Sequence, residues 1–315
     1  MIRIAILLLL FNTSLFAATK QAPVKPIRIG IYLTSLYNFD YSKGTFSAGY
    51  YLWTVADDPN YDPTKSLEVV NAIDYRMANQ TRGKNPDGTT YTTVHLYNTN
   101  LHYWNVKHFP FDRQQLKIII EDASDLLSIK FKPDLKESGI IHTLKVEGWD
   151  VQGMQINTYP FKYKSNFGNE DYSYGLYSRL TVTISLKREG LRLFVNYFIG
   201  FFVALILTSL IFFIDPKEIG TRSGYVLSSL FASVGNKYII DGLIPPVTEF
   251  TLIDAIQFLT FAQVLIAVFT TLYVFNLAKS DQHEKAKKIS QRVGYVVVPM
   301  VFILLIFFSL IAMLS

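Results

Sequence analysis

One stretch of mixed polarity limits the possible folds of this chain most strongly. Residues 219–246, IGTRSGYVLSSLFASVGNKYIIDGLIPP, are apolar enough to lie in a bilayer, yet polar side chains recur along them. Between Arg222 and Pro245, a helix of roughly 20 residues would cross a hydrocarbon core of about 30 Å, because each residue rises about 1.5 Å. Polar groups are costly against lipid, so we expect part of this helix to face protein or water.

Helical spacing divides the same stretch into faces. Steps of three and four residues place mostly small side chains, interrupted by aromatic ones, on one face: Gly224, Ser228, Phe231, Gly235, Tyr238 and Gly242. One interpretation is a pore-lining helix in which Phe231 forms a dewetting constriction. The other is close helix packing through small residues. The stretch alone does not decide between the two interpretations.

The last part of the chain, residues 191–315, predicts a transmembrane domain. Half of the residues of the whole chain are hydrophobic. Four apolar segments, each long enough to span a bilayer, lie near 192–214, 220–242, 251–277 and 291–314. Lys and Arg occur in the connections after the first and third segments but not in the connection 243–250. The positive-inside rule therefore predicts a multi-pass cell-membrane protein whose N-terminal domain and C-terminus are extracytoplasmic.

Residues 1–18, MIRIAILLLLFNTSLFAA, are typical of a secretory signal peptide. Arg3 precedes a short apolar run that ends in small residues. The mature chain is expected to begin near Ala18 or Thr19. Its first part would then be exported, which agrees with the orientation that the charged connections predict.

Residues 19–190 predict an extracellular antiparallel β-sandwich. Period-two runs rich in Tyr, Ile, Val and Thr recur, such as YTTVHLYNTNLHYWNV and SRLTVTISLKR. Turn-forming pairs such as Asp58-Pro59 and Gly168-Asn169 separate the runs. About ten short strands in this length are typical of a β-sandwich.

Several classes of function lack support in the sequence. The absence of cysteine excludes disulfides and cysteine nucleophiles. The net charge of +5 is modest, and no basic run with interleaved aromatics indicates nucleic-acid binding. The five histidines show no metal-ligand spacing, no catalytic constellation can be argued, and we expect neither an enzyme nor a cofactor. Whether the chain binds a metal ion remains open.

A short motif points to a family. Phe109-Pro110-Phe111-Asp112, followed by Gln114, is similar to the signature loop of the pentameric ligand-gated ion channels, the Cys-loop receptor superfamily. The flanking cysteines of the animal receptors would fall at His102 and Leu116, so the chain resembles the cysteine-less prokaryotic members. Matches such as Trp149, Arg188, Asn196 and Arg222 extend the resemblance over the mature chain. The resemblance implies a homopentamer of five copies in membrane lipid, opened to permeant ions by a small extracellular ligand.

The resemblance also assigns residues to gating. It implies that the signature loop rests on the outer ends of the spans, with Asp112 near Arg188 and the aromatic rings against the 243–250 connection. The residues expected to couple ligand binding to gating are Phe109, Pro110, Phe111, Asp112, Arg188 and Pro245, with Asp40 as a weaker candidate. A strand-connecting turn is the simpler interpretation of the same motif, because Pro and Asp favour turns.

A ligand cleft between neighbouring subunits is likewise implied by the resemblance. Tyr51 falls where the complementary face of the cleft usually has an aromatic residue. Four aromatic residues fall in the hairpin that usually caps the cleft: Phe167, Tyr172, Tyr174 and Tyr177. Aromatic walls suit a cationic amine. Three carboxylates occupy the segment where many receptors have a principal-face aromatic, and they would attract an amine, protons or a divalent cation: Glu121, Asp122 and Asp125. Ordinary strand tyrosines and solvated loop charges are the simpler alternatives.

Departures from the family pattern leave ion selectivity open. Gly200 stands where the first span usually has proline, and the residues around Arg222 match neither the cation-channel nor the anion-channel pattern. Lys237 and Asp241 are four residues apart, which predicts a structural ion pair, with Asp254 as a further partner. With Lys237 paired in this way, the carboxylate of Glu218 weakly favours a cation-conducting pore.

The alternative function is a receptor-like pentamer that binds ligand but conducts poorly or not at all. A membrane-anchored β-domain enzyme is the least favoured interpretation.

Overall fold

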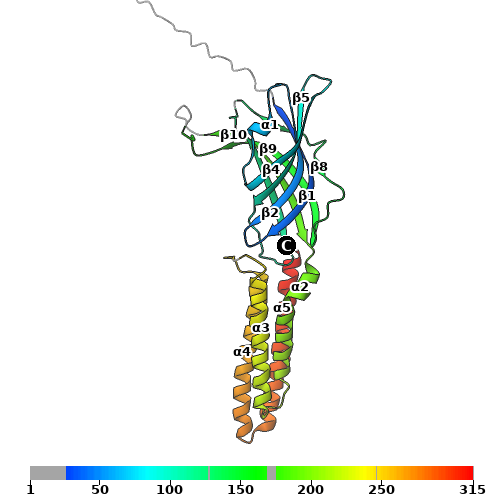
Figure 1. Ribbon diagram of the computed structural model, residues 1–315. Helices are drawn as coiled ribbons and strands as arrows, with labels where there is room; N and C mark the ends of the chain where they lie inside the picture. The colour runs from blue at the N-terminus through cyan, green and yellow to red at the C-terminus, as the bar shows by residue number, and fades with distance from the viewer. Residues whose placement is uncertain (1–25, 127, 169–174, 246, 315) are drawn as a thin grey trace, which may run out of the picture.

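A computed structural model describes residues 26–126, 128–168, 175–245 and 247–314. A domain of β-strands lies above a bundle of long helices, and the C-terminal end of the chain returns to the strands (Figure 1). The expected signal peptide, Tyr172 and Tyr174 lie outside the described residues.

Ten strands and one short helix make up the described part of the first domain. In chain order they are β1 (Ile27–Asp40), β2 (Thr45–Ala56), α1 (Pro63–Ser66), β3 (Leu67–Val69), β4 (Ala72–Lys84), β5 (Thr90–Leu101), β6 (Arg113–Asp122), β7 (Phe131–Pro133), β8 (Gly139–Ile140), β9 (Trp149–Lys162) and β10 (Leu176–Arg188). Four long helices follow: α2 (Gly190–Ile211), α3 (Ile219–Asp241), α4 (Leu252–Lys279) and α5 (His283–Leu314).

The strands form two sheets. One has the order β4-β5-β2-β1-β7, with β8 also beside β1, and the other has the order β3-β6-β10-β9. Neighbouring strands are antiparallel, except that β1 pairs in parallel with β7 and β8. The fold is therefore a mostly antiparallel, sandwich-like sheet domain followed by helices.

The core of the β domain follows from the period of two in its strands. Every second residue of β5 is buried from Thr90 to Asn100, and β6 alternates in the same way through Leu116 and Ile118. Successive side chains of a strand point to opposite faces, so the apolar half of each strand faces the other sheet. Buried side chains of both sheets join in one cluster, which continues into the ends of the helices next to the β domain through Phe198 and Ile256.

Three of the long helices, α2, α4 and α5, are long and apolar enough to cross a membrane, so the chain is a membrane protein. The sequence led us to expect four such segments. The remaining helix, α3, is 23 residues long but contains more polar side chains, and it is not among the three. That α3 also spans the membrane is therefore a proposal.

The last helix begins earlier than expected, at His283 instead of residue 291. The residues that precede the apolar run, His283 to Ser290, include Glu, Lys and Ala, which are good helix formers. Hydropathy identifies only the apolar part of a helix, so the sequence did not predict the charged first turns of α5.

Candidate functional site

Arg188 and Asp112 join the end of the β domain to the signature loop. The Arg188 side chain donates from Nε to Asp112 Oδ1 at 2.6 Å and from Nη2 to Oδ2 at 3.1 Å. Gln114 Nε2 donates to the same carboxylate at 2.7 Å, and both charged side chains are buried. Such a two-pronged contact fixes geometry as well as charge. The expected proximity of Asp112 and Arg188 is confirmed.

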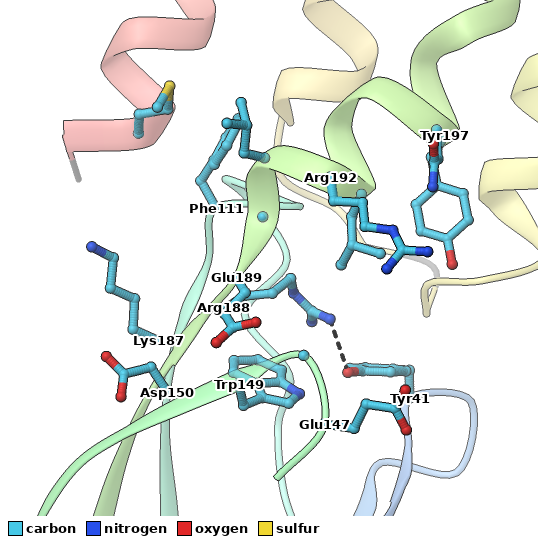
Figure 2. Close-up of a pocket in the computed structure, with 16 residues that line it drawn as sticks. Tyr41, Phe111, Glu147, Trp149, Asp150, Lys187, Arg188, Glu189, Arg192 and Tyr197 are labelled. Atoms are coloured by element: carbon cyan, nitrogen blue, oxygen red, sulfur yellow. Dashed lines mark hydrogen bonds between the residues drawn. The ribbon is translucent and has the colours of Figure 1, made fainter. Parts of the chain in front are cut away.

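Aromatic rings enclose the Arg188 guanidinium. Its carbon lies 4.1 Å from the ring centroid of Trp149 and 5.1 Å from that of Phe109. Its Nη1 donates to the Tyr41 hydroxyl at 3.1 Å (Figure 2). Burial by itself would lower the pKa of Arg188, but the hydrogen bond and the charge of Asp112 outweigh burial and raise it. Arg188 therefore remains charged in a position from which water is largely excluded.

The signature loop packs against the first helix of the bundle. The peptide bond between Phe109 and Pro110 is cis. The Phe109 ring stacks on Tyr197 with a centroid distance of 6.1 Å, and the Phe111 ring lies 5.4 Å from Phe194. Both partners belong to α2. Phe109 and Phe111 also belong to the hydrophobic cluster that includes Ile244 and Val247 of the 243–250 connection, so the expected packing of the rings against this connection stays a prediction.

Two backbone contacts explain how closely the loop approaches the helices. A Cβ atom at Gly190, the first residue of α2, would overlap the Pro110 carbonyl oxygen, so only glycine allows this approach. The backbone N–H of Leu252, where α4 begins, donates to the Lys107 carbonyl oxygen at 3.1 Å. The loop is thus held between the N-terminal ends of α2 and α4.

A cavity of about 1020 Å³ opens at this junction, between β9, β10 and α2, and Met313 near the end of α5 also lines it (Figure 2). Arg188 and Trp149 form part of its wall. Charged side chains of both signs line the rest: Glu147, Asp150, Lys187, Glu189 and Arg192. The cavity therefore borders the Arg188–Asp112 pair on one side and the first turns of α2 on the other.

Asp40 does not belong to the Arg188 cluster. Its carboxylate lies 3.4 Å from Lys43 Nζ and accepts a hydrogen bond from the Lys43 backbone N–H at 2.8 Å. The turn that contains Asp40 does line a second cavity, of about 610 Å³, together with Gly242 and Leu243. Pro245 lies half-buried in the connection after these two residues. The β1–β2 turn therefore lies beside the C-terminal end of α3, although the Asp40 carboxylate itself contacts Lys43 of the same turn.

The predicted pore face of α3 points away from the other helices of the chain. All six of its residues are at least partly exposed, and Phe231 and Tyr238 are 77% and 76% exposed. A Cβ atom at Gly224 or Gly235 would meet no atom within 4 Å. A different set of α3 residues packs inside the bundle: Arg222, Ser229, Ser233, Asn236 and Ile240. Close packing within one chain therefore does not account for the small residues of the predicted pore face.

An ion pair near the C-terminal end of α3 confirms the prediction from spacing. Lys237 Nζ lies 2.8 Å from Asp241 Oδ1 and 3.7 Å from Asp254 Oδ1. Asp254 also accepts hydrogen bonds from Thr251, in a capping box that begins α4. One lysine is therefore shared between two carboxylates, which leaves net negative charge at this end of α3.

Three of the predicted ligand-binding residues lie around one cavity of about 310 Å³ beside the β9–β10 hairpin. Glu121, Phe167 and Tyr177 line it together with Tyr163 and Glu68. The Phe167 ring lies edge-on to Tyr163, at a centroid distance of 5.2 Å, and is 60% exposed. The structure thus brings an aromatic group and two carboxylates together.

Glu121 and Asp122 are buried, contrary to our simpler alternative of solvated loop charge. Glu121 pairs with Arg179, which is opposite it in the β6–β10 ladder, and accepts a hydrogen bond from the Tyr163 hydroxyl at 2.9 Å. Asp122 accepts hydrogen bonds from Tyr61, Ser66 and Ser124. Both residues end strand β6 and have partners that are distant in the sequence, so sequence alone cannot show their burial. Asp125 accepts a hydrogen bond from the Ser128 backbone.

Tyr51 lies on the other sheet, away from this cavity. Its ring stacks on His95 at 4.2 Å, and the Tyr97 hydroxyl lies 3.2 Å from His95 Nδ1. The Arg76 guanidinium carbon lies 5.1 Å from the Tyr97 ring centroid. A single chain therefore does not bring Tyr51 together with Phe167 and Tyr177.

Sequence reasoning missed Tyr163, Glu68 and Arg179. Tyr163 directly follows the period-two run of β9. Strand β9 pairs with β10, and the pairing ends where Lys162 lies opposite Leu176. Two aromatic-rich runs on either side of Gly168 were therefore a signal that Tyr163 and Tyr177 would meet. Arg179 offered no local signal, because its partner Glu121 lies on another strand.

Comparison with known proteins found no family model and no curated protein that matches this sequence. The function must therefore be argued from the residues and their arrangement.

Proposed function

We propose that this chain is one subunit of a homopentameric ion channel that an extracellular ligand opens, with five copies of α3 around the pore. The unpartnered small-residue face of α3 is the observation that supports this proposal best. In the membrane, we expect such a face of a helix to be covered by other copies of the chain or by water, and not by lipid. The Arg188–Asp112 pair and the signature loop supply a rigid connection from the β domain to the bundle.

The proposed pore would favour cations. Lys237 is shared between Asp241 and Asp254, so the outer end of α3 contributes net negative charge. Glu218, at the other end, is exposed and forms no ion pair within the described residues. Rings of carboxylates raise the local concentration of cations at a pore mouth. The proposed orientation places the β domain outside the cell, because the basic connections of the bundle are at its opposite end.

The proposed ligand is a small molecule with a cationic amine. Phe167 and Tyr177 offer aromatic faces, and Glu68 offers an exposed carboxylate in the same cavity. Tyr51 would complete the site from a neighbouring copy, since it lies on the other sheet of its own chain.

A receptor-like pentamer that conducts poorly is the second candidate. Phe231 and Tyr238 both project from the proposed pore face, and rings of five such side chains would narrow the path at two levels.

Ion flux from purified protein in liposomes tests the proposal. We expect cation flux into the liposomes. Under voltage clamp, we expect a cation current that increases when small amines are added one at a time. Specific amine binding without flux would favour the second candidate, and a monomer in detergent and in nanodiscs would contradict both.

A further inference from the structure

A separate cavity opens between the edges of the two sheets of the β domain. Strand β7 lies at the edge of one sheet, and β9 lies at the edge of the other. The walls of this cavity come from β7, β9, β10 and the segment that leads into β7, and its volume is about 460 Å³. Such a volume is in the range of pockets that hold small ligands. None of its lining residues lines the cavity beside the β9–β10 hairpin.

Much of the wall of this edge cavity is apolar. Phe131 in β7 is 3% exposed and belongs to the core cluster of the β domain. Leu126, which is half-buried, and Pro160, which is exposed, add further apolar surface. These walls favour a ligand with a compact apolar body, because the removal of apolar surface from water is favourable.

A buried hydroxyl group in the same wall has a hydrogen to donate. Ser178 in β10 is 3% exposed, and its Oγ accepts a hydrogen bond from the Phe131 backbone N–H at 2.8 Å. A serine hydroxyl can also donate one hydrogen bond, but Ser178 donates none within the described residues. A buried donor without an acceptor costs free energy. An oxygen atom of a ligand that accepts from Ser178 would remove this cost.

The charge in the wall of the edge cavity is positive. Lys130 lines the cavity, and no Asp or Glu is among the described residues that line it. The Lys130 carbonyl oxygen accepts a hydrogen bond from the Ile27 backbone N–H at 2.8 Å, which fixes this residue beside β1. Its ammonium group forms no ion pair in the part of the chain that the structure describes. An anionic group is therefore the charged group that the cavity can accommodate.

We propose that the edge cavity binds a small monocarboxylate with a compact apolar body, such as an aromatic or short aliphatic acid. The carboxylate accepts hydrogen bonds from the Lys130 ammonium and the Ser178 hydroxyl, while the body of the acid packs on the apolar wall. A phosphate or sulfate ion would leave that wall unused, and Lys130 would repel an amine. Because the contacts come from both sheets, the bound acid stabilises the folded β domain. This inference rests on the β domain alone and not on channel activity.

Ligand-observed NMR of the purified full-length protein tests the proposal with three probes of similar size: benzoate, benzyl alcohol and benzylamine. We expect saturable binding of benzoate and much weaker binding of benzyl alcohol. Lys130→Gln should weaken benzoate binding about fivefold or more, because it removes the charged hydrogen-bond donor. The matched control is Lys132→Gln, which removes the same charge from an exposed residue of β7 that does not line the cavity. Thermal unfolding establishes that both variants fold.

The site would be overturned by equal benzoate binding in the two variants, by equal binding of benzoate and benzyl alcohol, or by the absence of saturable benzoate binding. Photolabelling with para-azidobenzoate, followed by peptide mapping, locates the ligand independently. We expect label in segments 126–131 and 158–160, and label confined to other segments would contradict the proposal. Benzylamine should bind instead beside Glu68 and Phe167, in the proposed amine site. The benzoate and benzylamine results therefore distinguish failure of this inference from failure of the proposed function.

Discussion

The backbone N–H of Gly200 in α2 donates a hydrogen bond to the side-chain Oδ1 of Asn236 in α3 at 2.9 Å. A Cβ atom at residue 200 would lie 2.6 Å from the Cβ of Asn236, which is closer than real Cβ contacts come. Gly200 thus stands at this position because α3 packs directly on its backbone. The contact sets the distance between the first helix of the bundle and the proposed pore helix.

We predict that Gly200→Ala destabilises the protein by about 1 to 3 kcal/mol, the usual cost of overpacking a well-packed contact. Gly220→Ala is the matched control, because a Cβ there would meet no atom within 4 Å. The control should be neutral or slightly stabilising, since alanine favours helix more than glycine does. Thermal unfolding of both variants in one detergent measures the difference. A Gly200→Ala variant as stable as its control would contradict the packing.

Removal of either Arg188 or Asp112 should be costly, because each would leave the other as a buried, uncompensated charge. We expect a loss of about 3 to 5 kcal/mol in stability for Arg188→Ala or Asp112→Ala. The double variant should lose less than the sum of the two single variants. Denaturant unfolding of all four proteins forms a double-mutant cycle. Additive losses would show that the pair does not act as a unit.

The order of the elements followed from local patterns, whereas the site depended on contacts that no local pattern shows. Period-two runs predict strands because one face of each sheet is buried, and the four-residue spacing of Lys237 and Asp241 predicts their ion pair. The burial of Glu121 could not be predicted, because Arg179 is a partner only after β6 and β10 have paired. For the same reason, the contacts of Phe109 and Phe111 with α2 required Gly190 to be placed beside Pro110.

Acid should weaken the β domain through His102. Burial lowers the pKa of this residue, whose Nε2 lies 3.3 Å from Gln114 Oε1. In the unfolded chain histidine titrates near about 6.5, so below that pH the unfolded state binds more protons than the folded state, and stability falls as pH falls. We expect a thermal midpoint that decreases from about pH 7 to about pH 5, and a smaller decrease in His102→Gln. His142→Gln, at an exposed position, is the control and should keep the slope of the unmodified protein.

The proposed gate can be tested at Phe231. Replacement of its ring by alanine or serine should raise the resting conductance severalfold, because five apolar rings exclude water from a narrow pore. Leu230→Ala is the control, since this half-buried neighbour lies off the exposed stripe. Basal currents in liposomes, normalised to the amount of protein, provide the measurement. Equal basal currents in both variants would indicate that Phe231 points away from the pore axis.

Ion selectivity is the prediction most directly linked to the charges at the two ends of α3. Since Lys237 is already paired with Asp241 and Asp254, reversal potentials in a dilution gradient should follow sodium or potassium and not chloride. Lys237→Gln should leave two uncompensated carboxylates and strengthen cation preference, whereas Glu218→Gln should weaken it, because fewer carboxylates then attract cations. Chloride-following potentials in the unmodified protein would contradict this assignment. They would imply that Lys237 leaves its partners and faces the pore when the channel opens, while Glu218 lies outside it.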